Sequence, residues 1–352
     1  MVEQRIHEII KQISDQERFS GVVLVQKGDD VLLHRAYGYA SRAWKILNSS
    51  EMLYSTASLT KMFTAAAVLQ LIESGLLSLN TKVQNILKLE RPAISTDITL
   101  QHLLMHTSGL PDYYDEYQSS DLEYAQLWEH RPNYSTRHLS DFLPLVPNRM
   151  PDFKPGEQFA YCNTGYIILG LLIEKIAEQS YYSYVKQNVF SKAGMRRSGF
   201  LPLDHTVENV ADGHIAILDE DDKVIGWKRN IFSVPLKGSP DGGAFSTTTD
   251  LMLFFNALRK GKLLNEKLTN QMLTEYGQVN HEGDQSWAYG LGLAFLLDGK
   301  DVIRYGHSGD DPGVSTKAFH YPRQEIDLII LGNQTDCASE VGERLHEMIM
   351  MW

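Results

Sequence analysis

The chain has 352 residues, of which 43% are hydrophobic and 22% charged, and its formal net charge at pH 7 is −11. This composition is ordinary for a globular protein, and the length suits two domains or one domain with a large insertion. The acidic balance argues against nucleic acid as a partner, because a phosphate backbone calls for a basic face.

The sequence shows no pattern typical of a membrane segment or a signal peptide. No apolar run approaches the roughly 18 residues that a membrane helix needs, so no membrane segment is predicted. Residues 1–20 are charged and amphipathic and lack the apolar core of a signal peptide. The sequence as written predicts a cytoplasmic protein, or a secreted one if a leader has been removed. Two cysteines, Cys162 and Cys337, give no disulfide framework.

The first elements follow directly from apolar spacing. Isoleucines at 6, 9, 10 and 13 share one face of a predicted N-terminal helix. The stretch GVVLVQKGDDVLLHRAYGYA, from Gly21, reads as two strands joined by a turn at Gly28-Asp29-Asp30. From Ser58 to about Leu273 the chain shows mainly helical patterns and long loops. Its Pro111–Met150 stretch, rich in tyrosine and acid, predicts either a functional lid or a solvated loop.

Strand patterns return near the C-terminal end, at Leu291–Leu297, Asp301–Tyr305, Val314–Tyr321 and Ile326–Leu331. Val341, Leu345, Met348 and Trp352 then mark a closing helix. Strands at both ends with helices between them predict an α+β fold, in which one antiparallel sheet from both chain ends is flanked by helices and carries a mainly helical insertion. We expect residues 1–57 with 285–352 to form the sheet subdomain and 58–284 the helical subdomain.

A lysine stands where a buried helix is expected. In STASLTKMFTAAAVLQLIESG the residues after Ser58 are apolar on nearly every side, yet Lys61 lies in the first turn. Lysine is almost never fully buried without a partner. Ser58 lies three residues earlier and therefore on the same helix face, so a desolvated lysine could activate its hydroxyl. The alternative is a helix-capping serine followed by a snorkelling lysine.

Two further stretches add candidates. Tyr161 and Asn163 come just before another apolar helix, where Tyr161 could relay a proton and Asn163 could hydrogen-bond a substrate amide; a tyrosine there can also serve packing alone. The stretch RYGHSGDDPGVS, which contains His307, ends a predicted strand in glycines that would let a substrate backbone lie along the strand edge.

Together these motifs resemble the serine β-lactamases and penicillin-binding proteins, nearest the class C β-lactamase branch, which includes D,D-peptidases, D-aminopeptidases and esterases. The family motifs S-x-x-K, Y-x-N and H-x-G match Ser58–Lys61, Tyr161–Asn163 and His307–Gly309 in order. Supporting similarity lies in ITLQHLLMHTSGLP, GGAFSTTTDL and YGLGL. The resemblance covers nearly the whole chain and implies one catalytic unit of the β-lactamase/D,D-peptidase-like fold.

The resemblance also implies a role for each motif residue. Ser58 would be the acylated nucleophile, Lys61 its proton acceptor or the group that tunes Tyr161, and Tyr161 the base that later protonates the leaving group. Asn163, His307, Ser308 and Gly309 would bind the substrate. The backbone N–H groups of Ser58 and Asp310 would form the oxyanion hole.

The implied function is a serine hydrolase that cleaves an ester, an amide or a D-amino-acid peptide bond. Its partners would be a small-molecule or short-peptide substrate, with β-lactams as possible covalent ligands, and no cofactor or metal is expected; His102 and His106 are four residues apart but lack a third ligand nearby. His307 replaces a lysine usual in dedicated β-lactamases, and Asp310 and Asp311 add negative charge. Peptidase, amidase or esterase activity is therefore expected over efficient β-lactam turnover.

Three rival interpretations remain. The stretch Gly306–Asp310 nearly matches the G-x-S-x-G nucleophile elbow, with Ser308 as nucleophile, but that motif needs a helix directly after it. Cys162 as a thiol nucleophile has no nearby group to lower its pKa. A non-catalytic penicillin-binding sensor or scaffold of the same fold would keep the motifs without turnover.

Overall fold

The computed structural model of the chain describes residues 2–114, 124, 126–128, 131–274, 276–282 and 285–352. Its largest element is an antiparallel eight-stranded sheet in the order β2-β1-β14-β13-β12-β11-β10-β9. The first strand of the chain pairs with the last, so that Gly21 lies opposite Gly332. The strands are β1 (Gly21–Lys27), β2 (Asp30–Tyr37), β9 (Tyr276–Glu282), β10 (Gln285–Gly290), β11 (Ala294–Asp298), β12 (Asp301–Asp311), β13 (Val314–Tyr321) and β14 (Ile326–Gly332).

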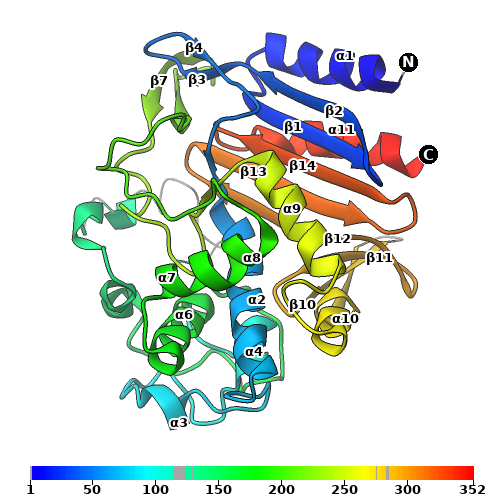
Figure 1. The fold of residues 1–352 in the computed structure, drawn as a ribbon. Helices are drawn as coiled ribbons and strands as arrows, with labels where there is room; N and C mark the ends of the chain where they lie inside the picture. The colour runs from blue at the N-terminus through cyan, green and yellow to red at the C-terminus, as the bar shows by residue number, and fades with distance from the viewer. Residues whose placement is uncertain (1, 115–123, 125, 129–130, 275, 283–284) are drawn as a thin grey trace.

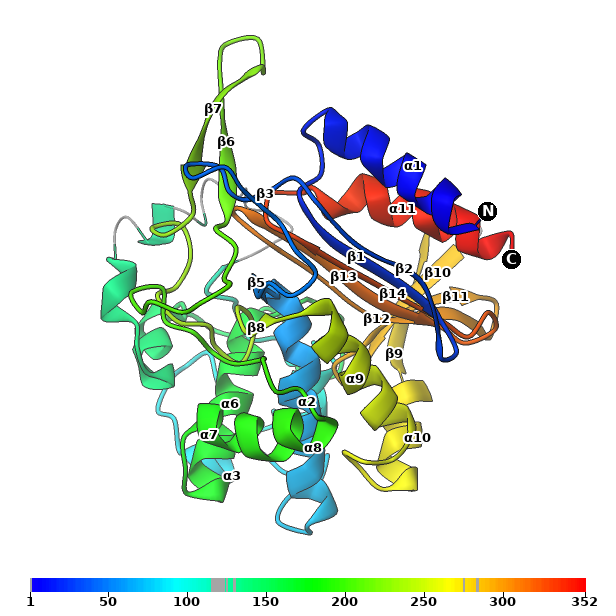
Figure 2. The same cartoon turned by 45° about the horizontal axis from the view of Figure 1, so that its top comes forward.

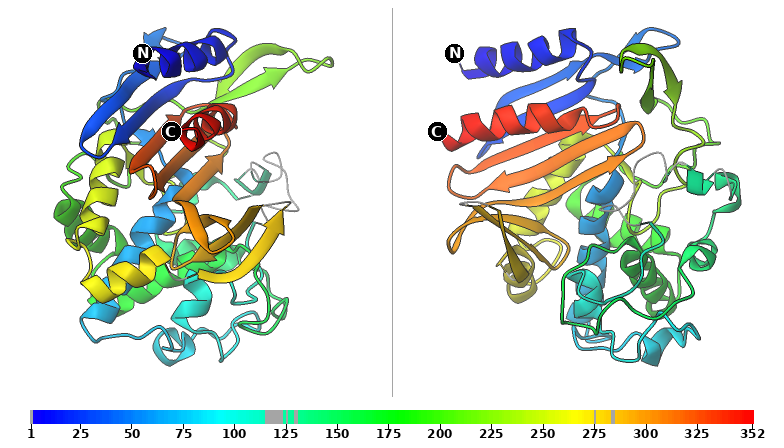
Figure 3. Two further views of the ribbon diagram at one scale, coloured as in Figure 1. Left: turned by 90° about the vertical axis from the view of Figure 1, so that its right-hand side faces the viewer. Right: turned by 180° about the vertical axis from the view of Figure 1, so that it is seen from behind.

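Helices cover both faces of this sheet. The two terminal helices, α1 (Val2–Asp15) and α11 (Ala338–Met350), lie side by side on the outer face (Figure 1; Figure 3). Side chains alternate between the faces of a strand, and β1 follows this rule. Val23 and Val25 pack with α1 and α11, whereas Val22 and Leu24 pack toward the helical part of the chain. A sheet buried on both faces explains why β1 and β14 are almost wholly apolar.

The inner face carries the helical part of the chain. Its helices are α2 (Thr60–Glu73), α3 (Gln84–Leu87), α4 (Leu100–Leu104), α6 (Asn163–Ala177), α7 (Tyr181–Val185), α8 (Ser191–Ala193), α9 (Thr248–Arg259) and α10 (Glu266–Thr274). Short helical turns are η1 (Ala57–Leu59), η2 (Asn133–Ser135), η3 (Leu139–Leu145) and η4 (Lys186–Phe190). Short strand pairs are β3 (Tyr39–Ser41) with β4 (Ile46–Leu47), β5 (Tyr54–Ser55) with β8 (Phe245–Ser246), and β6 (His214–Leu218) with β7 (Val224–Arg229). The β6–β7 hairpin projects from the body of the molecule (Figure 2).

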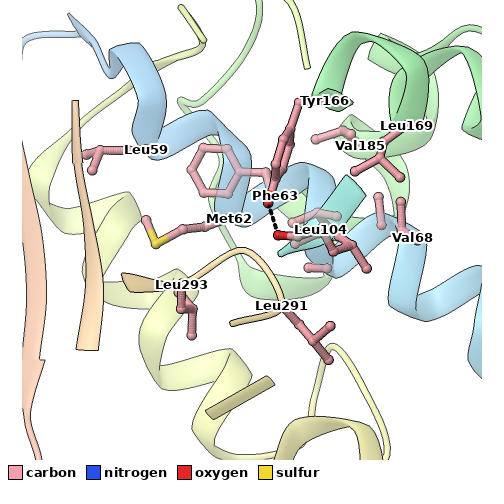
Figure 4. Close-up of a cluster of buried hydrophobic side chains, with 14 of the residues drawn as sticks. Leu59, Met62, Phe63, Val68, Leu104, Tyr166, Leu169, Val185, Leu291 and Leu293 are labelled. Atoms are coloured by element: carbon pink, nitrogen blue, oxygen red, sulfur yellow. Dashed lines mark hydrogen bonds between the residues drawn. The ribbon is translucent and has the colours of Figure 1, made fainter. Parts of the chain in front are cut away.

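Helix α2 is buried on every side, as its sequence predicts. All residues from Thr60 to Leu71 are buried, and Met62 and Phe63 lie in the core beside Tyr166 of α6 (Figure 4). The Tyr166 hydroxyl, which could not be buried cheaply without a partner, donates to the carbonyl oxygen of Leu104 at 3.0 Å. The core therefore fixes α2, and with it Lys61, between the sheet and α6.

Most predicted elements are confirmed, with several corrections. β12 extends from Asp301 through Asp311, past the predicted end at Tyr305, because its C-terminal part pairs with β13. Strands β9, β10 and the β6–β7 hairpin were not predicted, because their sequences are polar or lack clear alternation. Trp352 follows α11 and is 40% exposed, so it does not belong to the buried helix face. Because β9 joins the sheet, the sheet reaches into segment 58–284, and the two-subdomain division stays a prediction.

The Pro111–Met150 stretch is partly packed. Trp128 and Phe142 are buried against Ile167 of α6 in a small apolar cluster, so those parts are not solvated loop. Residues 115–123, 125 and 129–130 lie outside the described residues, and the lid prediction therefore stays open. Among the helices that the structure describes, none combines the length and apolar character needed to cross a bilayer.

Candidate active site

The first motif begins in a strained turn. Ser58 lies in η1, just before α2, and the preceding Ala57 has φ +42°, a conformation that is costly for a residue with a Cβ atom. The N–H of Gly243 donates to the Ala57 carbonyl oxygen at 3.1 Å and holds the turn in place. Strand β12 also approaches closely, since a Cβ atom at Gly309 would lie 2.6 Å from the Ser58 nitrogen. Only glycine fits at that point of the third motif.

Lys61 is completely buried and bonded by three oxygen atoms. Its Nζ lies 2.9 Å from Ser58 Oγ, 2.7 Å from Asn163 Oδ1 and 2.7 Å from the carbonyl oxygen of Asp241. An ammonium group would donate all three bonds, whereas a neutral amine would donate two and accept the Ser58 proton. Both protonation states therefore satisfy this geometry, and the alternative of a snorkelling lysine is wrong because Lys61 does not reach solvent.

The Tyr161 ring packs beside the side-chain nitrogen of Lys61. Lys61 Nζ lies 4.7 Å from the centre of the Tyr161 ring, and the ring of the buried His106 stacks on Tyr161 at a centroid distance of 4.2 Å. His106 also binds both neighbours of Tyr161: its carbonyl oxygen accepts from the Ala160 N–H at 2.9 Å, and its Nδ1 accepts from the Cys162 N–H at 3.0 Å. His106 thus positions Tyr161 and is not available as a metal ligand through Nδ1.

The second-motif asparagine occupies the first turn of α6. Backbone N–H groups at a helix start lack intrahelical partners. The carboxylate of Asp112 accepts from the N–H of Asn163 at 2.7 Å and from the N–H of Thr164 at 2.8 Å. Asp112 therefore fixes the start of α6, and the Asn163 side chain is left to bind Lys61.

The third motif lies on the part of β12 that extends beyond its neighbour. β11 pairs with β12 only as far as Gly306, so among the described strands residues 307–311 have a partner on the β13 side alone. His307 is buried, and burial together with the charge of Lys61 lowers its pKa to about 3. Its Nδ1 donates to the Ser308 carbonyl oxygen, and its Nε2 accepts from the Tyr289 hydroxyl at 2.8 Å. His307 is therefore neutral at pH 7.

A cavity of about 260 Å³ opens beside Ser58. Of the predicted site residues, Ser58, Asn163 and Asp310 line it, and Asp311 lies next to Asp310 in its wall. Its remaining lining is mixed, with tyrosines, aliphatic side chains and carboxylates from several loops: Tyr113, Tyr114, Tyr124, Val210, Asp212, Arg229, Val234 and Asp241 are among them. The cavity could hold a small molecule or the end of a short peptide.

The structure brings the three motifs together and excludes two rivals. Residues around Ser308 continue as strand, not as a strand followed by a helix, so a nucleophile elbow is absent at this described segment. Burial raises the pKa of the Cys162 thiol well above its usual range, which removes the thiolate that a nucleophile needs. Three supporting residues escaped sequence reasoning as site residues: Asp112, Asp241 and Tyr289. All three lie in or directly beside stretches that resemble the family: Asp112 follows HTSGLP, Asp241 precedes GGAFSTTTDL, and Tyr289 begins YGLGL.

The fold and this arrangement define the class of serine β-lactamases and penicillin-binding proteins. A model of the family described as Beta-lactamase matches residues 6–348. The chain belongs to that family. In the crystal structure of a penicillin binding protein from Bacillus halodurans, 99% of that chain and 96% of this one superpose with a TM-score of 0.88 at 36% sequence identity.

Three further similar proteins have lower sequence identity to this chain. Penicillin-binding protein 4* of Bacillus subtilis (strain 168) is 28% identical over 342 residues, which are 95% of this chain and 72% of that protein. Protein flp of Staphylococcus aureus (strain N315) is 29% identical over 360 residues, and this chain spans 66% of its length. The D-amino acid amidase from Ochrobactrum anthropi SV3 shares the fold, with a TM-score of 0.80 over 100% of this chain and 98% of that one at 21% identity.

Proposed function

We propose that the protein is a serine hydrolase that cleaves an ester, an amide or a D-amino-acid peptide bond through an acyl-enzyme, with β-lactams as substrate analogues. The observation that carries this proposal is the 2.9 Å contact between Lys61 Nζ and Ser58 Oγ beside a cavity. A serine hydroxyl becomes a good nucleophile when a positioned base accepts its proton. A buried lysine whose other two hydrogen bonds are fixed is such a partner.

Lys61 and Tyr161 together transfer the proton of the Ser58 hydroxyl to the leaving group. In one assignment Lys61 accepts it from Ser58 directly; in the other, a charged Lys61 favours the Tyr161 phenolate, which accepts it. In both, the carbonyl carbon of the substrate forms a bond to Ser58 Oγ and its bond to the leaving group then breaks. Tyr161 gives its proton to the leaving group, and in the first assignment it recovers a proton from Lys61. Water then attacks the acyl-enzyme and Ser58 is regenerated, so atoms and charge balance without a cofactor or metal.

Backbone donors stabilise the tetrahedral oxyanion. The close approach of β12 at Gly309 to the Ser58 nitrogen supports the pairing of the Ser58 N–H with the N–H of Asp310. Each donor of this kind contributes roughly 2.7–4 kcal/mol in the transition state. Asn163 binds the substrate carbonyl or amide. The edge of β12 at His307, Ser308 and Gly309, which pairs with no second strand among the described residues, aligns the substrate backbone.

The neutral state of His307 supports a peptidase, amidase or esterase over an efficient β-lactamase. With its pKa lowered to about 3, His307 offers no positive charge to the carboxylate of a penicillin or of a D-alanyl peptide. Asp310 and Asp311 in the cavity wall repel such a carboxylate instead.

Two measurements on one sample test the proposal. A fluorophosphonate or a labelled penicillin should add its mass to the tryptic peptide that contains Ser58, and acyl esters, D-aminoacyl amides, D-alanyl-D-alanine peptides and a cephalosporin should be screened for turnover. Release of product from at least one substrate supports the hydrolase. A permanent penicillin adduct without turnover of any substrate would favour the sensor instead, and labelling elsewhere than Ser58 would overturn the assignment.

A further inference from the structure

The loop between β7 and β8 carries a buried carboxylate into the wall of the cavity. Asp241 is 4% exposed and lines the same cavity as Ser58. Ser239 and Gly242 exchange backbone hydrogen bonds on either side of it, and its own carbonyl oxygen accepts from Lys61 Nζ at 2.7 Å. The position of Asp241 is therefore fixed relative to the nucleophile through a single lysine.

Only neutral groups bind the Asp241 carboxylate within the described residues. The Tyr113 hydroxyl donates to Oδ2 at 2.6 Å, and the Ser239 hydroxyl donates to Oδ1. Burial, and next the charge of Asp241, raise the pKa of Tyr113 well above its usual range, so the phenol keeps its proton and donates it. A carboxylate accepts about four hydrogen bonds, and these two hydroxyls leave lone pairs for a ligand.

The other carboxylates of the cavity differ from Asp241. Asp212 forms an ion pair with Arg229 at 2.8 Å, so its charge is already balanced. Asp310 is exposed and Asp311 partly exposed, so water and salt screen both. A buried carboxylate is costly unless hydrogen bonds and an opposite charge compensate it. In the part of the chain that the structure describes, the Asp241 carboxylate has hydroxyl partners and no ion pair, and Lys61 binds the backbone carbonyl of this residue instead.

We propose that Asp241 binds the protonated amine of the substrate, so that the enzyme selects aminoacyl amides or esters with a free α-amino group. The proposal rests on the hydrolase function proposed above and names its substrate class. The substrate carbonyl carbon lies at Ser58, and the ammonium group on the neighbouring α-carbon donates to the Asp241 carboxylate. Tyr113 and Ser239 are positioning residues that hold the carboxylate.

The experiment compares one substrate with and without its positive charge. The ratio of kcat/KM for D-alanine 4-nitroanilide to that for its N-acetyl derivative should be well above one in the wild type. Asp241→Asn keeps the size of the side chain and an acceptor for Tyr113. It should lower that ratio by about 10- to 100-fold, the effect of losing a charged hydrogen bond. Asp241→Glu, which keeps the charge, should recover part of the ratio.

Asp212→Asn is the matched control, because it removes a carboxylate from the same cavity whose charge Arg229 already balances; its ratio should stay at the wild-type value. An equal fall of both substrates in Asp241→Asn would assign a structural role to Asp241 and overturn the proposal. So would a wild type that prefers the acetylated substrate.

A binding measurement separates this proposal from the hydrolase function and does not depend on turnover or on the folding of one variant. By titration calorimetry, the wild type should bind D-alaninol more tightly than N-acetyl-D-alaninol, and Tyr113→Phe should keep the preference because the carboxylate remains. Equal binding of the two alcohols overturns the role of Asp241. Amine-selective binding by a protein that hydrolyses neither the anilides nor 4-nitrophenyl acetate instead overturns the hydrolase function.

Discussion

The two faces of the central sheet are built for different tasks. The outer face packs apolar side chains of α1 and α11 against β1 and β14, and its buried residues are almost all aliphatic or aromatic. The inner face packs α2 and α6 and buries polar groups, among them Lys61, Asn163 and Asp241. Buried polar groups are costly unless each has a partner, so the inner face depends on a connected set of hydrogen bonds to hold these groups in place. Substitutions on the inner face should therefore lower catalytic activity, whereas substitutions on the outer face should lower the free energy of unfolding.

The largest effect is expected at Ser58, the proposed nucleophile. Ser58→Ala should lower turnover of any accepted substrate by about 10⁶-fold, the scale of losing a covalent nucleophile, while the midpoint of thermal unfolding changes little. Steady-state kinetics on one sample measure the loss of turnover, and a melting curve on the same sample measures the midpoint of unfolding. Cys162→Ser is the control, since it alters a buried neighbour of Asn163 without a chemical role; a loss comparable to Ser58→Ala would contradict that assignment.

Removal of the lysine should cost less than removal of the nucleophile. Lys61→Ala should slow acylation by roughly 10³- to 10⁴-fold, the scale of a proton-transfer group and its charge. Pre-steady-state acylation across pH 6–10 should be compared for Lys61→Ala and Tyr161→Phe. If Tyr161→Phe acylates at nearly the wild-type rate, Lys61 is the direct acceptor; if both are equally slow, Lys61 acts through Tyr161. Near wild-type acylation by Lys61→Ala would refute both roles.

The outer face should show the opposite behaviour. Leu345 of α11 is 1% exposed, and Leu345→Ala should lower the free energy of unfolding by about 2–5 kcal/mol by leaving a cavity. Its kcat/KM measured well below the melting temperature should equal that of the wild type. Urea denaturation and kinetics at 20 °C test this, and a fall in kcat/KM without loss of stability would contradict the division between the faces.

Buried histidines predict the dependence of stability on pH. Burial lowers the pKa of His214 to about 4 and that of His307 to about 3. Between those values and the unfolded pKa of about 6.5, the unfolded chain binds more protons than the folded one, so stability rises with pH through this window and is lost as pH falls. Each histidine contributes at most about 1.4 kcal/mol per pH unit. Urea midpoints at pH 7.5 and 5.0 should differ, and His214→Gln should reduce that difference; an unchanged difference would contradict its role.

The smallest effect is expected at the rim of the cavity. Asp310→Asn with Asp311→Asn should raise kcat/KM for a D-alanyl-D-alanine peptide relative to D-alanine amide by only a few fold, because both carboxylates reach solvent. The measurement is the ratio of the two substrates at 20 and at 200 mM salt. An unchanged ratio at low salt would show that these two charges do not act on the substrate.

Sequence patterns predicted the sheet more fully than the helical part. Apolar runs such as GVVLVQ and IDLIIL identify strands wherever both faces are buried, and their pairing across the two chain ends followed from the order of elements. β9 is the edge strand and is largely polar, and β10 beside it is short and lacks clear alternation, so periodicity did not reveal them. The edge position of a strand depends on its neighbours in space and not on its own residues.

The site residues also fall into those that local sequence motifs indicate and those that only the folded structure reveals. The three motifs are local. Spacing on one helix face made Ser58 and Lys61 candidates, and the family resemblance gave Tyr161, Asn163, His307 and Gly309 their expected roles. Asp112 and Asp241 act through partners 51 and 180 positions away along the chain, at Asn163 and at Lys61. Contacts over such separations leave no periodic signal in one sequence. Asp112 and Asp241 therefore become visible as site residues only in the folded structure.

The pairing of β1 with β14 also affects when the sheet can form as the chain is translated. β1 is translated well before its partner β14, since most of the described elements lie between them, and Gly21 pairs with Gly332. Contacts between such distant segments form slowly, and until they form one edge of β1 is exposed. β12 and β13 are also translated after α2, so Gly309 reaches the Ser58 nitrogen late. The surroundings of Ser58 are therefore complete only after β12 has been translated and has paired with β13.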